Sequence, residues 1–329
     1  MTEYKLDAIS FLCAILLSVI LGFILIPILK KLKAGQNVLG YVENHASKAG
    51  TTTMGGFIFA LSALIIFFIF SKKGSLATVA LIVSSCFLIV GFLDDYIKIK
   101  SGKNQGLTAL QKIVFQTVIS LLTAVFVYFK GMTCFFIPFL NQYYDFKIFG
   151  AFIVFFVFLA TTNCINLTDG LDGLAGGVSY VYLLLSYLLL KLQTILFSSN
   201  VANYNEIYNL SLLCLVQAGA LIGFLFFNTY SAKVFMGDTG SLYLGGIIAT
   251  TAIFSANTLF IPFFGIMFVL SGISVIIQVL IYKKTKKRVF LMAPLHHHFE
   301  YKGHSESKIV FSYKMITLIV GIACIISIM

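Results

Sequence analysis

The chain has 329 residues, of which 59% are hydrophobic and 11% charged, and its formal net charge is +11. A soluble domain carries about 25% charged residues, so a mean hydropathy of +0.99 excludes a soluble protein and predicts an integral membrane protein. Few charges interrupt the apolar runs, which favours helices over the alternating strands of an outer-membrane barrel. No polar segment is long enough to form its own core, so residues 1–329 are expected to form a single membrane domain.

Ten apolar runs follow one another, each close to the length that crosses a bilayer. They are residues 9–29, 53–70, 76–93, 110–129, 148–162, 174–190, 210–227, 242–256, 260–282 and 309–329. Lys30, Lys31 and Lys33 follow the first run, so the positive-inside rule places the N-terminus outside. Both termini then lie outside, with sixteen basic residues in cytoplasmic loops against six in outside segments. We therefore predict an all-α, ten-helix protein, and expect an external hairpin near residues 141–147.

The same topology brings five aspartates to the cytoplasmic ends of helices. They are Asp94, Asp95, Asp169, Asp172 and Asp238. Ionisable groups beside membrane segments are costly and are usually functional or paired. Several carboxylates on one face, surrounded by lysines, predict a cytoplasmic-facing cleft for a divalent metal and an anionic ligand.

Asp94 and Asp95 stand at the predicted end of the third helix, followed by Lys98. Adjacent carboxylates repel each other, and Mg²⁺ bridging them to a phosphate would relieve that repulsion. Two solvated acids in a loop are the simpler alternative.

A polar stretch that holds Asn163, Asn166, Asp169 and Asp172 lies between two apolar runs. If Thr168 caps a helix there, the two aspartates face one side of its first turn. Such a patch suits a divalent metal or a hydroxyl-rich ligand, and a capped helix start is the alternative.

The segment Phe235-Met-Gly-Asp238 is predicted to open the eighth helix. Glycines let a backbone approach a ligand, and the free N–H groups of a helix start favour phosphate. Asp238 would offer a hard oxygen ligand to Mg²⁺. A helix cap with a glycine turn is the alternative.

Three consecutive histidines, His296, His297 and His298, lie in the longest predicted cytoplasmic loop, after a basic run at 283–288. Neighbouring helical residues point about 100° apart, so phosphate hydrogen bonding or loop structure is favoured over a zinc site. The basic run predicts topology anchoring and attraction to lipid headgroups. Lys48 precedes a glycine- and threonine-rich helix entry, where it can meet a phosphate.

Together, five motifs resemble the polyprenyl-phosphate N-acetylhexosamine-1-phosphate transferases. They are GTTTMGG at 50–56, DDYIK at 94–98, NCINLTDGLDGLA at 163–175, FMGDTGS at 235–241 and APLHHHFE at 293–300. They span most of the chain in family order, and the triple histidine favours the muramoyl branch of the family. Thr52 stands where the family usually has proline, which removes no chemical group.

The resemblance implies ten helices in the bacterial cell membrane, commonly as a homodimer, and no nucleic-acid partner. It implies Mg²⁺-dependent transfer of phospho-N-acetylmuramoyl-pentapeptide from UDP-MurNAc-pentapeptide to undecaprenyl phosphate. The products are UMP and lipid I, in the first membrane step of peptidoglycan synthesis.

The resemblance also assigns roles to residues. Asp238 would bind the metal, and Asp94 and Asp95 would lie near the metal and the lipid phosphate, with Asp94 a candidate base. The remaining substrate contacts would come from Lys48, Lys98, Asn163, Asn166, Asp169, Asp172, Asn228, Phe235 (on the uracil) and His296–His298, with His297 among the catalytic residues.

Two other functions stay open from the sequence. One is a sister enzyme that transfers N-acetylglucosamine-1-phosphate from its UDP carrier. The other is an ion-coupled transporter, although the acids lie at one face rather than at mid-membrane and no repeat is visible.

Overall fold

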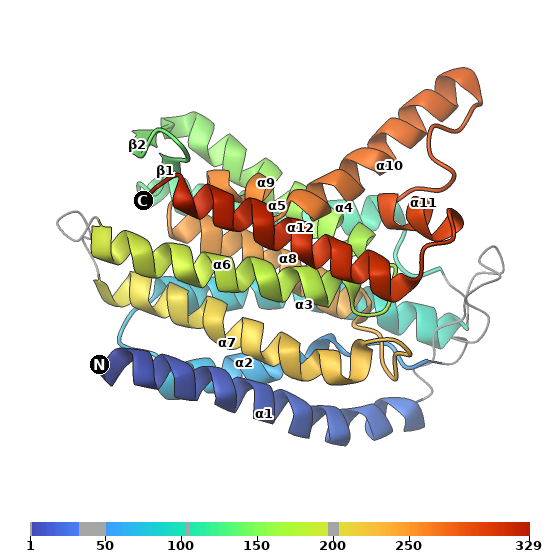
Figure 1. Ribbon diagram of the computed structural model, residues 1–329, viewed down its shortest axis with the longest axis horizontal. Coiled ribbons are helices and arrows are strands. Elements are labelled where there is room, and N and C mark those ends of the chain that lie inside the picture. The colour runs from blue at the N-terminus through green and yellow to red at the C-terminus, as the bar shows by residue number, and fades with distance from the viewer. Residues whose placement is uncertain (1, 33–50, 103–104, 197–203) are drawn as a thin grey trace.

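The structure is a computed structural model that describes residues 2–32, 51–102, 105–196 and 204–329. It is a bundle of long helices with one small hairpin (Figure 1). The helices are α1 (Thr2–Lys31), α2 (Gly56–Phe70), α3 (Leu76–Ser101), α4 (Ala109–Phe129), α5 (Lys147–Thr168), α6 (Leu174–Leu196), α7 (Tyr204–Asn228), α8 (Gly237–Phe254), the 3-10 helix η3 (Thr258–Phe260), α9 (Ile261–Phe264), α10 (Ile266–Thr285), α11 (Leu295–Tyr301) and α12 (Glu306–Ile326).

The predicted external hairpin exists and begins earlier than expected. Strands β1 (Cys134–Ile137) and β2 (Gln142–Asp145) pair antiparallel, with Cys134 opposite Asp145. The hairpin, the N-terminus and the C-terminus lie at the same end of the bundle, and α11 lies at the opposite end (Figure 1).

Eight of the described helices are long and apolar enough to cross a membrane. These are α1, α3, α4, α5, α6, α7, α10 and α12, which confirms an all-α polytopic membrane protein. Helix α2 is apolar but only 15 residues long, and α8 has 18 residues with Asp238 in its first turn. These two coincide with the remaining predicted runs, so ten crossings stay a prediction.

Helix α8 forms the centre of the bundle, and every residue from Thr239 to Phe254 is buried. Its closest neighbour is α3, which approaches through glycine. A Cβ atom added at Gly91 would lie only 2.1 Å from the backbone oxygen of Asp238. Small residues permit such contact between membrane helices, and here the contact fixes the start of α8 against α3.

The prediction of one unbroken helix over 260–282 is wrong. The chain forms η3 and the short α9, and α10 begins only at Ile266. Pro262 lies in the first turn of α9, where its missing N–H is tolerated, and Gly265 adopts a non-helical conformation. Beyond this break, α10 projects away from the bundle (Figure 1).

At the end that holds the termini, ion pairs attach α1 to the rest of the bundle. Lys72 Nζ lies 2.5 Å from a Glu3 carboxylate oxygen, and Lys191 Nζ lies 2.8 Å from Asp7 Oδ2. The Tyr187 hydroxyl donates to the same Asp7 oxygen at 2.9 Å. Asp7 is buried, so α1 depends on these partners to place a carboxylate inside the protein.

Candidate active site

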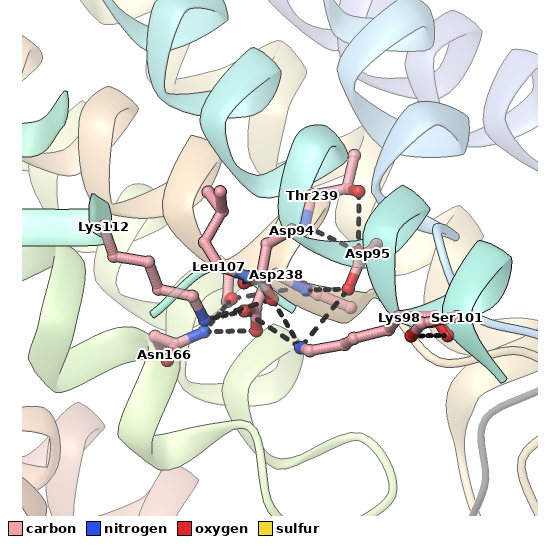
Figure 2. A network of polar contacts seen from close by, with 11 residues as sticks. Asp94, Asp95, Lys98, Ser101, Leu107, Lys112, Asn166, Asp238 and Thr239 are labelled. Atoms are coloured by element: carbon pink, nitrogen blue, oxygen red, sulfur yellow. Dashed lines mark hydrogen bonds and ion pairs between the residues drawn. The ribbon is translucent and has the colours of Figure 1, made fainter. Parts of the chain in front are cut away.

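The carboxylates of Asp94, Asp95 and Asp238 meet where α3 passes the start of α8 (Figure 2). One oxygen of each lies within 4.8 Å of the others. Asp94 and Asp95 are 0% and 2% exposed. Because α3 continues to Ser101, these two aspartates lie about two turns inside the helix, and not at its end as expected. We call the three carboxylates the acidic cluster.

Two lysines neutralise part of the acidic cluster. Lys98 Nζ lies 2.6 Å from Asp94 Oδ2 and 3.2 Å from Asp238 Oδ2. Lys112 Nζ lies 3.1 Å and 2.5 Å from the same two oxygens. Charge-assisted bonds of this length are strong in a buried setting. The side chains of Lys98 and Lys112 are 26% and 25% exposed, so both remain accessible from outside the cluster.

Lys112 is a candidate site residue that the sequence motifs did not indicate. It follows the start of α4, where Thr108 and Gln111 form a complete capping box. That cap fixes the direction of the first turn, and the first turn presents Lys112 to the acidic cluster. The sequence did offer one signal. Lys112 is a single lysine in the first turn of the apolar helix that follows the paired aspartates.

Asp95 supports Asp238 through the start of α8. Its Oδ2 accepts hydrogen bonds from Thr239 N at 2.9 Å and Thr239 Oγ1 at 2.7 Å, and its Oδ1 accepts from Asp238 N at 3.2 Å. A carboxylate at a helix N-terminus satisfies free N–H groups and complements the helix dipole. Asp95 thus fixes the backbone that carries Asp238, and its predicted catalytic role stays a prediction.

Asn166, on α5, orients Asp238. Its Nδ2 donates to Asp238 Oδ1 and to Ser241 Oγ, both at 2.8 Å. Asn163, one turn earlier on α5, donates to Gln116 Oε1 at 2.7 Å. The structure therefore brings Asn166 into the cluster and turns Asn163 towards α4.

The prediction that Thr168 caps a helix carrying Asp169 and Asp172 is wrong. Thr168 is the last residue of α5, its hydroxyl bonds back to the Cys164 carbonyl at 2.7 Å, and α6 begins only at Leu174. Threonine inside a helix commonly bonds the carbonyl four residues earlier. Both aspartates therefore lie in the α5–α6 connection.

The two aspartates of this connection have different surroundings. Asp172 is buried, and its Oδ2 accepts a hydrogen bond from Ala232 N at 3.0 Å. Burial, followed by the negative charges of Asp238, Asp95 and Asp172, raises the pKa of Asp169 to about 8. Asp169 is therefore within the electrostatic influence of the acidic cluster, whereas Asp172 holds the connection against the segment after α7.

The segment that carries Phe235 is held by its backbone. Phe235 N donates to the Thr52 carbonyl at 2.7 Å, and its own carbonyl accepts from Gly55 N at 2.8 Å. A proline at position 52 would supply the same carbonyl, so the departure from the family pattern costs nothing here. Asn228 is buried and donates to Val234 O at 2.9 Å. Lys48 lies outside the described residues.

The three histidines lie on α11, and their rings have different partners. His297 Nδ1 lies 2.8 Å from a Glu300 carboxylate oxygen, and His298 Nδ1 accepts a hydrogen bond from Leu291 N at 3.2 Å. His296 is fully buried, and burial, followed by the nearby His297 charge, lowers its pKa to about 3. A Cβ at Gly170 would lie 2.3 Å from His296 Nε2, so α11 packs directly on the α5–α6 connection.

The acidic cluster fits a divalent metal. Carboxylate oxygens are the hard ligands that Mg²⁺ prefers. Among the described residues, three carboxylates face two ammonium groups, so a cation would offset the remaining negative charge. Asp94 and Asp238 are better suited to hold it than Asp95, because their Oδ2 atoms contact the flexible side chains of Lys98 and Lys112, whereas backbone N–H groups at the start of α8 occupy both oxygens of Asp95.

The family model of glycosyl transferase family 4 matches residues 77–256, which include all of the acidic cluster. The chain belongs to glycosyl transferase family 4. Relatives named phospho-N-acetylmuramoyl-pentapeptide-transferase are similar to this member over most of their length. One from Clostridium perfringens is 43% identical, covering 91% of this chain and 92% of its own. One from Clostridioides difficile is 39% identical and covers 96% of each chain. The resemblance inferred from the motifs is confirmed.

Proposed function

We propose that this chain transfers phospho-N-acetylmuramoyl-pentapeptide from UDP-MurNAc-pentapeptide to undecaprenyl phosphate, giving lipid I and UMP. One observation carries the proposal. Relatives named for this activity align with more than nine-tenths of the chain, and residues 77–256, which match the family model, hold a buried carboxylate and lysine cluster suited to phosphate chemistry.

The chemistry sets requirements that the cluster meets. An oxygen of the acceptor phosphate attacks the β-phosphorus of the donor, a new P–O–P bond forms, and the bond to the bridging oxygen breaks so that UMP leaves. Several negative charges meet in this step, and catalysis consists mainly of positioning and electrostatic stabilisation. Lys98 and Lys112 would bind phosphate oxygens, and Mg²⁺ would supply further positive charge when bound.

Asp94 is better suited to positioning than to proton removal. A phosphate monoester has its second pKa near 6, so most of the acceptor is already dianionic at neutral pH. Asp94 Oδ2 lies within 2.6 Å and 3.1 Å of the two ammonium groups. Asp94 would therefore hold both ammonium groups in place for the acceptor. Asp238, which Asn166 orients, contacts the same two lysines.

The nucleotide end of the site would lie around Phe235, whose ring is partly exposed. Base stacking on an aromatic ring is sequence-tolerant and energetically useful, and uracil offers such a face. Asp169 and Asp172 would contact the nucleotide from the α5–α6 connection. Asn163 and Lys48 stay predicted contacts, and His297 would lie near the diphosphate because α11 packs on that connection.

The topology completes the proposal. Ten crossings, with α2 and α8 counted, would put both termini outside and the acidic cluster at the cytoplasmic face of the bacterial cell membrane. The positive-inside rule supports this orientation. A cytoplasmic cleft can receive a soluble nucleotide and a lipid phosphate at one boundary, and a homodimer is the expected assembly.

The test is a defined transfer reaction. Purified protein, Mg²⁺, UDP-MurNAc-pentapeptide and undecaprenyl phosphate should release UMP and form a lipid-linked product. UDP-N-acetylglucosamine serves as the matched donor. UMP release only with UDP-N-acetylglucosamine would assign the sister activity and overturn the proposal.

A further inference from the structure

The C-terminal end of α10 carries a dense cluster of exposed cations. Lys283, Lys284, Lys286, Lys287 and Arg288 are all exposed. Lys286 ends the helix in the left-handed conformation, with φ of 56°, so the chain turns back and presents these side chains together. We call these five residues the basic tip. It stands on the part of α10 that leaves the bundle (Figure 1).

A groove of about 610 Å³ lies beside the basic tip, between α10 and the segment that leads to α11. Val275, Val279 and Met292 are among its apolar lining residues, and Tyr282 and Arg288 line it near the tip. Val275 lies ten residues before the end of α10, about 15 Å along the helix axis. The groove is therefore mainly apolar along α10 and has one lining cation, Arg288, at the end next to the basic tip.

We propose that this groove binds an anionic phospholipid of the cytoplasmic leaflet, with its headgroup on the basic tip and an acyl chain against Val275 and Val279. An anionic lipid is chosen because of charge complementarity. The basic tip would attract an anionic headgroup, as basic residues at a membrane surface generally do. Tyrosine is favoured at the level of the lipid headgroups. Tyr282 lines the groove beside the basic tip, so the mouth of the groove would lie at that level. The substrate cations, Lys98 and Lys112, belong to a different set of helices.

The groove wall is bonded directly to the histidine helix. Gln278 Oε1 accepts hydrogen bonds from Val289 N at 3.1 Å and Phe290 N at 2.9 Å. The next residue, Leu291, donates to His298 Nδ1 at 3.2 Å, and the Phe290 and His298 rings are 5.6 Å apart. A lipid seated in the groove would therefore restrain the segment at 288–292 and, through it, α11.

Equilibrium binding of fluorescent phosphatidylglycerol to the purified full chain tests the headgroup contact, with fluorescent phosphatidylcholine as the neutral probe. The K286Q/K287Q variant should bind phosphatidylglycerol about twenty-fivefold more weakly, from a loss of about fivefold per lysine. K286R/K287R should bind normally. The matched control is K30Q/K31Q, which neutralises two adjacent exposed lysines at the end of α1 and should change little.

The groove itself is tested by filling it. Val279→Trp should abolish phosphatidylglycerol binding with all cations intact, whereas Ile276→Trp, on a 58% exposed position of α10 outside the groove lining, should not. Phosphatidylglycerol should also slow hydrogen exchange of the α11 amides in the unaltered chain and not in Val279→Trp.

Three results would overturn the inference. If K286Q/K287Q and K30Q/K31Q lost phosphatidylglycerol affinity equally, binding would depend on general surface charge and not on the basic tip. If Val279→Trp and Ile276→Trp lost it equally, the groove would not be the binding site. Displacement of phosphatidylglycerol by equimolar undecaprenyl phosphate would assign the groove to the acceptor lipid. None of these readouts requires turnover, so they stand apart from the transfer assay.

Discussion

The Asp95→Asn variant distinguishes a structural role for Asp95 at the start of α8 from a role as a metal ligand. Asparagine keeps the size of Asp95 and provides one acceptor oxygen. If that oxygen continues to accept from Thr239, the new NH₂ group faces the Asp238 N–H, and the 3.2 Å bond is lost. A hydrogen bond to a buried charged group contributes about 1.5–3 kcal/mol, and the charge at the helix N-terminus adds about 0.3–1 kcal/mol. The free energy of unfolding should fall by about 2–4 kcal/mol on these principles.

The assay combines unfolding in detergent with Mg²⁺-dependent UMP release. Asp95→Asn should unfold more easily and lower kcat, because Asp238 loses its fixed backbone, while the Mg²⁺ concentration for half-maximal activity changes little. Thr239→Val is the matched control. It removes only the 2.7 Å hydroxyl bond and should cost about 1–2 kcal/mol. Unchanged stability together with a tenfold or greater rise in the Mg²⁺ requirement would refute the reasoning and make Asp95 a ligand.

Four further predictions concern single side chains. Lys112→Gln should lower UMP release at least about a hundredfold, comparable with loss of a main electrostatic group, and near-normal turnover would remove it from the site. Phe235→Ala should weaken UDP-donor binding by roughly five- to a hundredfold and leave the KM for the lipid acceptor unchanged, and an equal effect on both would contradict the stacking role. The pKa of His296 is lower in the folded state than in the unfolded state, so unfolding takes up a proton and stability is lost as pH falls below about 6.5, by up to about 1.4 kcal/mol per unit. In His296→Gln the free energy of unfolding should lose this dependence on pH. An unchanged slope of that free energy against pH would contradict the assignment to His296. Lys191→Met should destabilise the protein by about 3–5 kcal/mol because it leaves Asp7 buried without its cation, and Asp7→Asn in the same chain should restore part of that loss.

Hydropathy predicted most of the bundle because a membrane helix must be long and apolar along its whole length. The same property hid the break at Gly265. Glycine and its apolar neighbours do not interrupt the hydrophobic run at 260–282, so hydropathy gives no sign that the helix ends there. The extension of α3 to Ser101 was hidden for the opposite reason, because its last two turns are polar and lie beyond the apolar core.

The acidic cluster was predictable in part because carboxylates beside apolar runs are rare and demand partners. The pairing of Lys112 with Asp238 was not, since 126 residues separate them and only the packing of α4 near α8 brings them together. The error at Thr168 has a local cause. Its hydroxyl can bond forward as a cap or back to Cys164 within α5, and the sequence does not distinguish the two.

The attachment of α1 has a consequence for the order in which the protein is assembled. Synthesis starts at the N-terminus, yet the partners of Asp7 include Tyr187 and Lys191 on α6, and α1 packs mainly on α7. An ionised carboxylate that is buried without its cation is costly. The first helix to leave the ribosome therefore lacks these partners until more than half of the chain has followed it. A nascent chain stalled before residue 191 would leave α1 loosely held and open to chaperones and proteases.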